Sequence, residues 1–96
     1  MRWQSLKQHD VEIAAALERL FVRQWVNSHG TRMTGECLWR ALGFTSSRTF
    51  QHAARAQHLG IQLYPMPSGR GRFALTEDVA RWVWMDLMRR KSGGLQ

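Results

Sequence analysis

The part of the chain that decides the fold is residues 34–58, which read TGECLWRALGFTSSRTFQHAARAQH. Thr34 is a typical residue at the start of a helix, and Glu36 lies where the positive end of the helix dipole favours an acid. Apolar side chains then follow at helical spacing, at Cys37, Leu38, Ala41 and Leu42. Gly43 interrupts this pattern. We predict a short helix with Cys37 as a small buried side chain on its apolar face.

A second helix is predicted directly after this glycine. Thr45-Ser46-Ser47 is a cluster of helix-capping residues, and we expect the helix to continue to about His58. Its apolar face consists of Phe50, Ala53 and Ala54, and the two small alanines allow close packing against the preceding helix. Two helices joined by a short turn that contains glycine form a helix-turn-helix unit, here over about residues 34–58.

The opposite face of the second helix carries hydrogen-bonding side chains, namely Arg48, Gln51, His52 and Arg55. The major groove of double-stranded DNA admits one α-helix, and there Arg pairs bidentately with guanine and Gln with adenine. Ser46 or Ser47, together with the free amides of the helix start, suits a phosphate. The alternative is that these polar side chains form only the solvated face of an amphipathic helix.

A β-hairpin is predicted over about residues 61–75. The segments 61–64 and 72–75 alternate with period two, which is typical of strands. The loop between them is rich in Pro, Gly and Ser and carries Arg70. We expect Arg70 and Arg72 to contact nucleic acid; the alternative is an ordinary polar hairpin tip.

A helix is predicted before this unit, over about residues 10–28, because apolar residues repeat at helical spacing at Ile13, Leu17, Leu20 and Phe21. We expect this face to be packed, Asp10 to be the N-cap and Gly30 to end the helix in a left-handed conformation. The segment from Leu20 to Val26 is also compatible with a strand. Residues 1–9 are expected to fray.

A last helix is predicted over about residues 76–91. Thr76 is its expected cap, acidic residues occupy its first turn, and the basic residues Arg89, Arg90 and Lys91 occupy its last turn, as the helix dipole favours. Its side chains expected to dock on the core are Val79, Trp82, Val83 and Leu87. The segment 92–94 is expected to be loose.

The charge of the chain is strongly positive and unevenly placed. Lys and Arg number 14 against 7 Asp and Glu, a formal net charge of +7. No acid lies between Glu36 and Glu77, whereas that stretch holds Arg40, Arg48, Arg55, Arg70 and Arg72. A protein charged only for solubility mixes its signs. Arg is also the residue best suited to forked hydrogen bonds with phosphate and guanine. This distribution indicates a nucleic-acid partner.

Other function classes find little support. The single Cys excludes an intrachain disulfide, and no apolar run approaches the length of a membrane span, so we expect a single cytoplasmic, nucleoid-associated domain over residues 1–96 with no membrane partner. The His and Cys residues lack the spacing of a metal site. Neither a catalytic set nor a phosphate-binding Gly loop is present, so we expect no cofactor and no enzymatic activity.

Several short motifs of residues 34–84 occur in the order of a known family. They are Leu42-Gly43-Phe44, Arg48-Thr49-Phe50, Arg55, Leu59-Gly60 and the stretch from Arg70 through Val79 to Trp82. In these motifs the chain resembles the winged-helix domains of phage and integrative-element excisionases and of MerR-type regulators. It departs from them in a capping cluster one residue longer, which leaves the register of the second helix open. It also has an additional N-terminal helix and lacks the C-terminal coiled coil of MerR regulators.

The resemblance implies a mainly α fold with a small β-hairpin: a winged helix-turn-helix with an extra N-terminal helix. It also implies sequence-specific binding of double-stranded DNA by a transcription regulator or an excisionase. In those families the second helix enters the major groove and the wing contacts backbone or minor groove. The expected DNA-binding residues are Arg40, Ser46, Ser47, Arg48, Gln51, His52, Arg55, Arg70 and Arg72.

Several partners remain open at this point. A second copy of the chain is one, because Trp25, Trp82, Trp84, Met85 and Met88 are too much apolar area for two helices to bury. An integrase or RNA polymerase is another. The alternative function is a non-DNA-binding adaptor or inhibitor that grips a protein through its Trp-rich helices. RNA binding is a third reading, although the middle of the chain offers few aromatic residues for base stacking.

Overall fold

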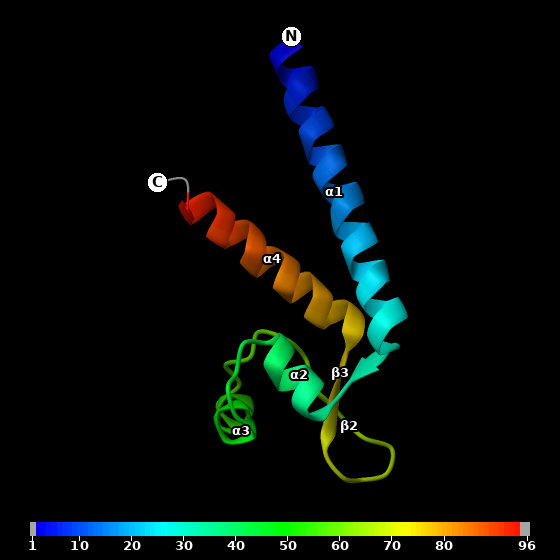
Figure 1. Ribbon diagram of the computed structural model, residues 1–96, viewed down its shortest axis with the longest axis vertical. Coiled ribbons are helices and arrows are strands. Elements are labelled where there is room, and N and C mark those ends of the chain that lie inside the picture. The colour runs from blue at the N-terminus through cyan, green and yellow to red at the C-terminus, as the bar shows by residue number, and fades with distance from the viewer. Residues whose placement is uncertain (1, 95–96) are drawn as a thin grey trace.

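The computed structural model describes the backbone of residues 2–94 and the side chains of residues 10–91. The elements follow one another in the order α1 (Arg2–His29), β1 (Arg32–Met33), α2 (Gly35–Ala41), α3 (Ser47–Arg55), β2 (Tyr64–Pro65), β3 (Arg72–Leu75) and α4 (Thr76–Gly94). The described chain is therefore mainly helical with one small antiparallel sheet, as expected at that level of detail (Figure 1).

The sheet has three strands in the order β1-β3-β2. Met33 of β1 pairs with Ala74 of β3, and Tyr64 of β2 pairs with Phe73. β1 was not expected from the sequence, and β2 is shorter than the predicted strand over residues 61–64. Ile61 and Leu63 are half-buried and pack against the core instead of forming a strand. Pro65 lies in an edge strand, where its missing N–H is tolerated.

α2 and α3 end in the same kind of turn. After α2, Gly43 has φ +90°, and the N–H of Phe44 donates to the carbonyl of Trp39 at 2.9 Å. After α3, Gln57 has φ 58°, and the N–H of His58 donates to the carbonyl of Ala53 at 2.9 Å. Both are Schellman motifs with a left-handed residue after the helix. α3 therefore ends at Arg55, and its predicted extension to His58 was wrong.

The core lies where α2, β3 and the first half of α4 meet. It consists of the buried side chains Met33, Leu38, Leu42, Ala74 and Val79. Half-buried Trp82 and Val83 pack against it as predicted, whereas Leu87 is 45% exposed and does not dock. The Thr76 hydroxyl is buried without a hydrogen-bond partner in the described chain, so the predicted cap at this residue was wrong. α4 continues through residues 92–94, which were expected to be loose.

α1 is one unbroken helix that includes Leu20–Val26, so the strand alternative is excluded. It begins at Arg2, so the prediction of Asp10 as N-cap was wrong; residues 2–9, which were expected to fray, form its first turns, and no Gly or Pro interrupts residues 2–29. Gly30 has φ +79° and donates to the Val26 carbonyl at 2.8 Å, which confirms the predicted stop.

The C-terminal half of α1 packs against α4, and the two helices then diverge (Figure 1). The ring centroids of Phe21 and Trp84 lie 5.3 Å apart at this contact. The apolar face expected to be packed is not: Ile13, Leu17 and Leu20 are 48%, 51% and 60% exposed. The divergence gives the molecule extents of 56 × 30 × 19 Å.

Candidate nucleic-acid interface

α3 presents one polar face to solvent. Its apolar side chains Phe50, Ala53 and Ala54 are half-buried, and Phe50 packs edge-on against Phe44 with centroids 5.7 Å apart. The predicted site residues of the opposite face are all exposed: Arg48, Gln51, His52 and Arg55. Arg48 and Arg55 are seven residues apart, which separates their Cα atoms by about 10 Å along the helix axis. The prediction that α3 has one packed apolar face and one exposed polar face is therefore confirmed.

The start of α3 is fixed by its serines. Ser46 is the N-cap; its Oγ accepts a hydrogen bond from the N–H of Thr49 at 3.2 Å and lies 3.0 Å from the Thr49 hydroxyl. The Ser46 side chain is therefore used within the helix start. Ser47 is exposed and its Oγ accepts from Nε2 of Gln51 at 3.3 Å, which leaves the Ser47 hydroxyl proton free to donate outward.

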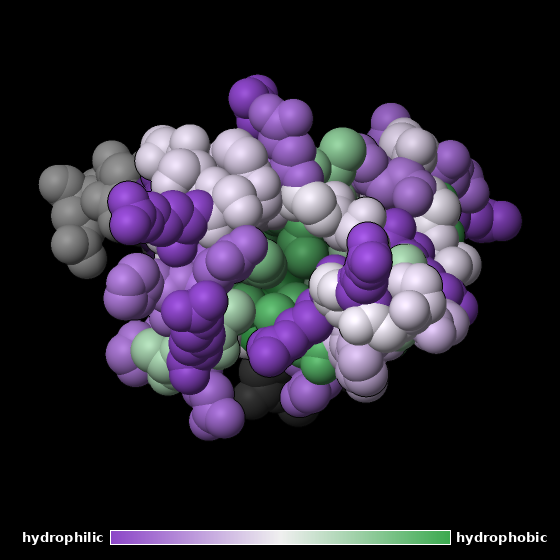
Figure 2. Space-filling view, turned by 90° about the horizontal axis from the view of Figure 1, so that it is seen from below, coloured by the Kyte–Doolittle hydropathy of each residue, from purple (hydrophilic) through white to green (hydrophobic). Residues whose placement is uncertain are grey.

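A groove joins this face of α3 to the start of β3. Its volume is about 260 Å³, and it is lined on one side by Gln51 and Arg55 and on the other by Gly71 and Arg72. The apolar residues Leu38, Phe50 and Leu63 also line it. Figure 2 shows this end of the molecule, with hydrophilic side chains surrounding a small apolar hollow. The fold thus brings predicted site residues from two segments together.

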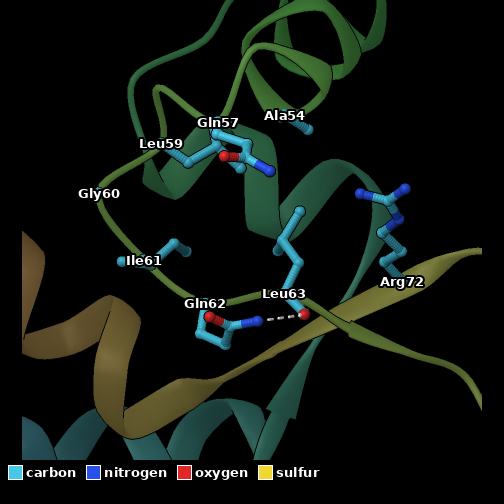
Figure 3. A pocket seen from close by; sticks show the side chains of 8 residues that line it. All are labelled: Ala54, Gln57, Leu59, Gly60, Ile61, Gln62, Leu63 and Arg72. Carbon is cyan, nitrogen blue, oxygen red and sulfur yellow. Dashed lines mark hydrogen bonds between the residues drawn. The ribbon is translucent and has the colours of Figure 1, made fainter.

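A second hollow of about 570 Å³ lies beside the groove, and Arg72 lines both. Figure 3 shows its wall, formed by Gln57 after α3, by residues 59–63 and by Arg72, whose guanidinium points toward α3. Gln62 donates a hydrogen bond through Nε2 to the Leu63 carbonyl at 3.1 Å. The polar side chains that line the second hollow are two amides and the Arg72 guanidinium, and those that line the groove are one amide and the guanidinium groups of Arg55 and Arg72. They contain no acid.

Arg70 lies in the loop between β2 and β3. Met66 donates through its N–H to the Gly71 carbonyl at 3.1 Å, and the N–H of Arg70 points to Ser68 Oγ at 3.4 Å. Gly69 and Gly71 have φ +83° and +77°, which glycine adopts without strain. Arg70 is exposed. This loop and α3 lie at the same end of the molecule, away from both termini (Figure 1).

Arg40 is the predicted site residue that has an acidic partner. Its guanidinium lies 2.6 Å from the carboxylate of Glu36 on the same face of α2, and it also lies over the ring of Trp39. Glu36 is the only acid between residues 19 and 76. Among the described residues no ion pair includes Arg48, Arg55, Arg70 or Arg72. Four guanidinium groups at this end thus carry uncompensated positive charge.

The sheet also holds a stacked set that the sequence did not indicate. The Arg32 guanidinium lies 4.8 Å from the ring centroid of Phe73, and the rings of Phe73 and Tyr64 are stacked 5.5 Å apart. Phe73 follows Arg72, so its side chain lies on the other face of the sheet. These contacts join β1, β3 and β2 on the face of the sheet opposite Arg72. The sequence did not indicate this contact because no strand was predicted at Arg32, which belongs to β1.

Cys37 is exposed on α2, so its prediction as a buried side chain was wrong. Over residues 10–91 no cluster of three or more His, Cys, Asp or Glu side chains is arranged to hold a metal ion. No helix within the described chain has the length and apolar character to cross a membrane.

Comparison with protein-family models, with curated proteins and with solved structures found no match for this chain.

Proposed function

We propose that this protein is a winged helix-turn-helix protein that binds double-stranded DNA in a sequence-specific manner and has no enzymatic role. The observation that carries the proposal is the groove in which Gln51 and Arg55 of α3 meet Arg72 of β3. In this proposal α2 and α3 are the helix-turn-helix unit, α3 is the recognition helix, and the β2–β3 loop is the wing.

Each part of the interface has a role in this proposal. Arg48, Gln51 and Arg55 read base edges in the major groove, because guanidinium and amide groups form paired hydrogen bonds with guanine and adenine. Arg72 and the Ser47 hydroxyl bind phosphates beside the groove and fix the register of α3. Arg70 reaches the backbone or the minor groove from the wing. His52 and Arg40 lie at the margin, and Arg40 must loosen its ion pair with Glu36 to contribute.

The electrostatics of the chain support this assignment. Phosphate contacts supply most of the affinity of DNA-binding proteins, and they require cations free of protein partners. Arg48, Arg55, Arg70 and Arg72 meet this condition among the described residues, whereas Arg81 and Arg90 on α4 are paired with acids four residues before them. Positive charge is therefore free at the proposed interface and partly neutralised elsewhere.

The biological output is either transcription regulation or excision of a mobile element, with an RNA polymerase or an integrase as the corresponding partner. Both outputs use the same DNA-binding surface. Footprints over tandem direct repeats, with bending of the DNA, would assign the protein to excision. A single palindrome over a promoter would assign it to regulation.

The proposal is tested by binding to duplexes selected from a random pool. The double variant Arg48→Ala/Arg55→Ala should lose at least tenfold in affinity for the selected duplex and less for a random duplex, because each bidentate base contact contributes about 1–3 kcal/mol of discrimination. The matched control Arg89→Ala/Arg90→Ala removes the same charge from α4 and should change both affinities little. Fluorescence anisotropy at two salt concentrations measures them.

Three results would contradict the proposal. Wild-type protein that binds no duplex at low salt would exclude DNA binding, and full retention of an in vivo activity by the Arg48→Ala/Arg55→Ala variant would favour the adaptor alternative. Tighter binding to single-stranded RNA than to any duplex would instead favour RNA recognition. The control variant separates the loss of these contacts from the loss of net charge.

A further inference from the structure

We propose that α1 is a dimerisation helix, which pairs antiparallel with α1 of a second copy through a seam formed by Ile13, Leu17 and Leu20. This inference concerns the end of the molecule opposite α3 and does not depend on DNA binding.

The seam is an apolar stripe without a packing partner among the side chains of residues 10–91. Ile13, Leu17 and Leu20 are spaced at four and three residues and are 48%, 51% and 60% exposed. This is the spacing of core positions in a coiled coil. Val22, which is buried, lies half a turn around α1 from Ile13, and Phe21, which contacts Trp84 of α4, lies at the margin of the seam, so α4 covers the helix from this margin round to Val22. The seam is thus accessible along its length.

The exposed surface of the molecule is large enough to include an interface with a partner. The chain exposes 7821 Å², whereas a compact monomer of its mass exposes about 5,700 Å². The excess of about 2,100 Å² is larger than the roughly 800 Å² that each partner buries in an interface of standard size. The radius of gyration is 16.3 Å, against about 12.5 Å for a compact chain of this length. The diverging half of α1 accounts for this elongation (Figure 1).

A second copy fits the seam because the sequence of α1 is complementary to itself in the antiparallel direction. With Leu17 opposite Leu17 of the second copy, Asp10 is level with Gln24 at each end of the seam, and Ile13 lies between the levels of Leu17 and Gln24, one residue (about 1.5 Å along the axis) from the level of Leu20. Glu12 then lies on the same flank as Arg23 of the second copy. In a parallel pair, by contrast, Asp10 would face another Asp10 across the seam. The charges therefore favour the antiparallel arrangement.

A partner also explains how the first half of α1 remains helical. The α4 contact covers only its C-terminal half, and an isolated helix of this length is marginal in water. Packing of the seam against a second α1 supplies the tertiary contact that the chain itself does not provide.

The test is the concentration dependence of the molecular mass, measured by sedimentation equilibrium without DNA. Wild-type protein should be a dimer at micromolar concentrations. Leu17→Glu should raise the dimer dissociation constant about a hundredfold or more, because each dimer contains the substitution twice at its centre. Met85→Glu is the matched control: Met85 is 60% exposed on α4, away from the seam, and its substitution should leave the dissociation constant unchanged.

The orientation is tested with single cysteines in a Cys37→Ser background and a short bismaleimide cross-linker. A mixture of Ile13→Cys and Leu20→Cys proteins should cross-link to each other, and each alone should cross-link poorly. Cross-linking of Ile13→Cys to itself would overturn the antiparallel arrangement.

Circular dichroism shows whether the variants keep their fold, since Leu17 and Met85 are both surface residues. A wild-type chain that sediments as a monomer at 100 µM protein (about 1 mg/ml), a folded Leu17→Glu protein that remains a dimer, or a Met85→Glu protein that dissociates would each overturn the proposal.

Discussion

At the scale of single residues, Arg32 on β1 and Arg70 in the β2–β3 loop carry the same charge in different surroundings. Arg70 is exposed in the β2–β3 loop, and the guanidinium of Arg32 lies over the ring of Phe73 on β3. Both residues are exposed, but the Arg32 guanidinium has this ring contact. Substitution of each of the two arginines therefore shows whether the affinity for DNA depends on the position of the positive charge or only on its presence.

Replacing Arg70 with Ala should weaken binding to specific and random duplexes by a similar factor and lower the slope of log affinity against log salt by about one. Arg32→Ala should leave this slope almost unchanged and instead lower the free energy of unfolding by about 0.5–1 kcal/mol, because the cation–π contact is lost. Titrations at several salt concentrations measure the slopes. Equal slopes for the two variants would remove the wing from the interface.

Thr76 is the residue at which the packing is least satisfied. Its side chain is fully buried, and its hydroxyl has no hydrogen-bond partner among the described residues. A buried hydroxyl without a partner lowers stability. Thr76→Val should therefore raise the free energy of unfolding by about 1 kcal/mol, measured by urea denaturation. Thr49→Val is the control and should lower it, because the Thr49 hydroxyl donates to the Ser46 carbonyl at 2.9 Å. Destabilisation by Thr76→Val would mean that the hydroxyl has a partner.

At the scale of elements, the two helices of the interface end in the same motif with different residues. Gly43 after α2 and Gln57 after α3 both have positive φ, at +90° and 58°. Glycine adopts this conformation without strain, whereas a side chain makes it less favourable. Nothing lies within 4 Å of a Cβ placed on Gly43, so at that position the backbone conformation alone decides the effect of a substitution.

Gln57→Gly should raise the free energy of unfolding by about 1 kcal/mol, and Gly43→Ala should lower it by a similar amount. Thermal unfolding of the two variants measures both changes. Because Gln57 lines the hollow beside Arg72, the Gln57→Gly protein also shows whether that amide contributes to DNA binding. A fall in stability for Gln57→Gly would indicate that its side chain makes contacts more favourable than the strain is costly.

At the scale of the whole molecule, α3 and the hairpin loop occupy one end and the diverging helices the other (Figure 1). If α1 pairs antiparallel with a second copy, the dimer has a two-fold axis through its centre. The two α3 helices are then related by that axis. A two-fold symmetric protein reads two half-sites of opposite orientation.

Sequences selected from a random duplex pool should therefore contain an inverted repeat, and wild-type protein should protect both halves in a footprint. The Leu17→Glu variant should protect a single half-site with lower affinity, whereas Met85→Glu should protect both. Direct repeats in the selected sequences would contradict two-fold pairing on DNA while leaving the recognition role of α3 intact.

Several local features of this protein followed from its sequence alone, although the caps expected at Asp10 and Thr76 did not. The glycine turn after α2, the stop at Gly30 and the polar face of α3 were predicted correctly. Each depends on residues a few positions apart, because helical spacing, capping and left-handed turns are properties of short segments. Helical spacing alone was therefore enough to place the α3 side chains of the candidate interface on one face.

Tertiary structure decided the features that depend on distant partners. Met33 forms a strand only because Ala74 lies beside it, and Arg72 lines a groove with Arg55 only because the sheet packs next to α3. The face of α1 that packs against α4 could not be predicted, because apolar residues cover more of this helix than one contact buries. The hydrophobic effect has no direction of its own. The position of α4 left Leu17 exposed and buried Val22.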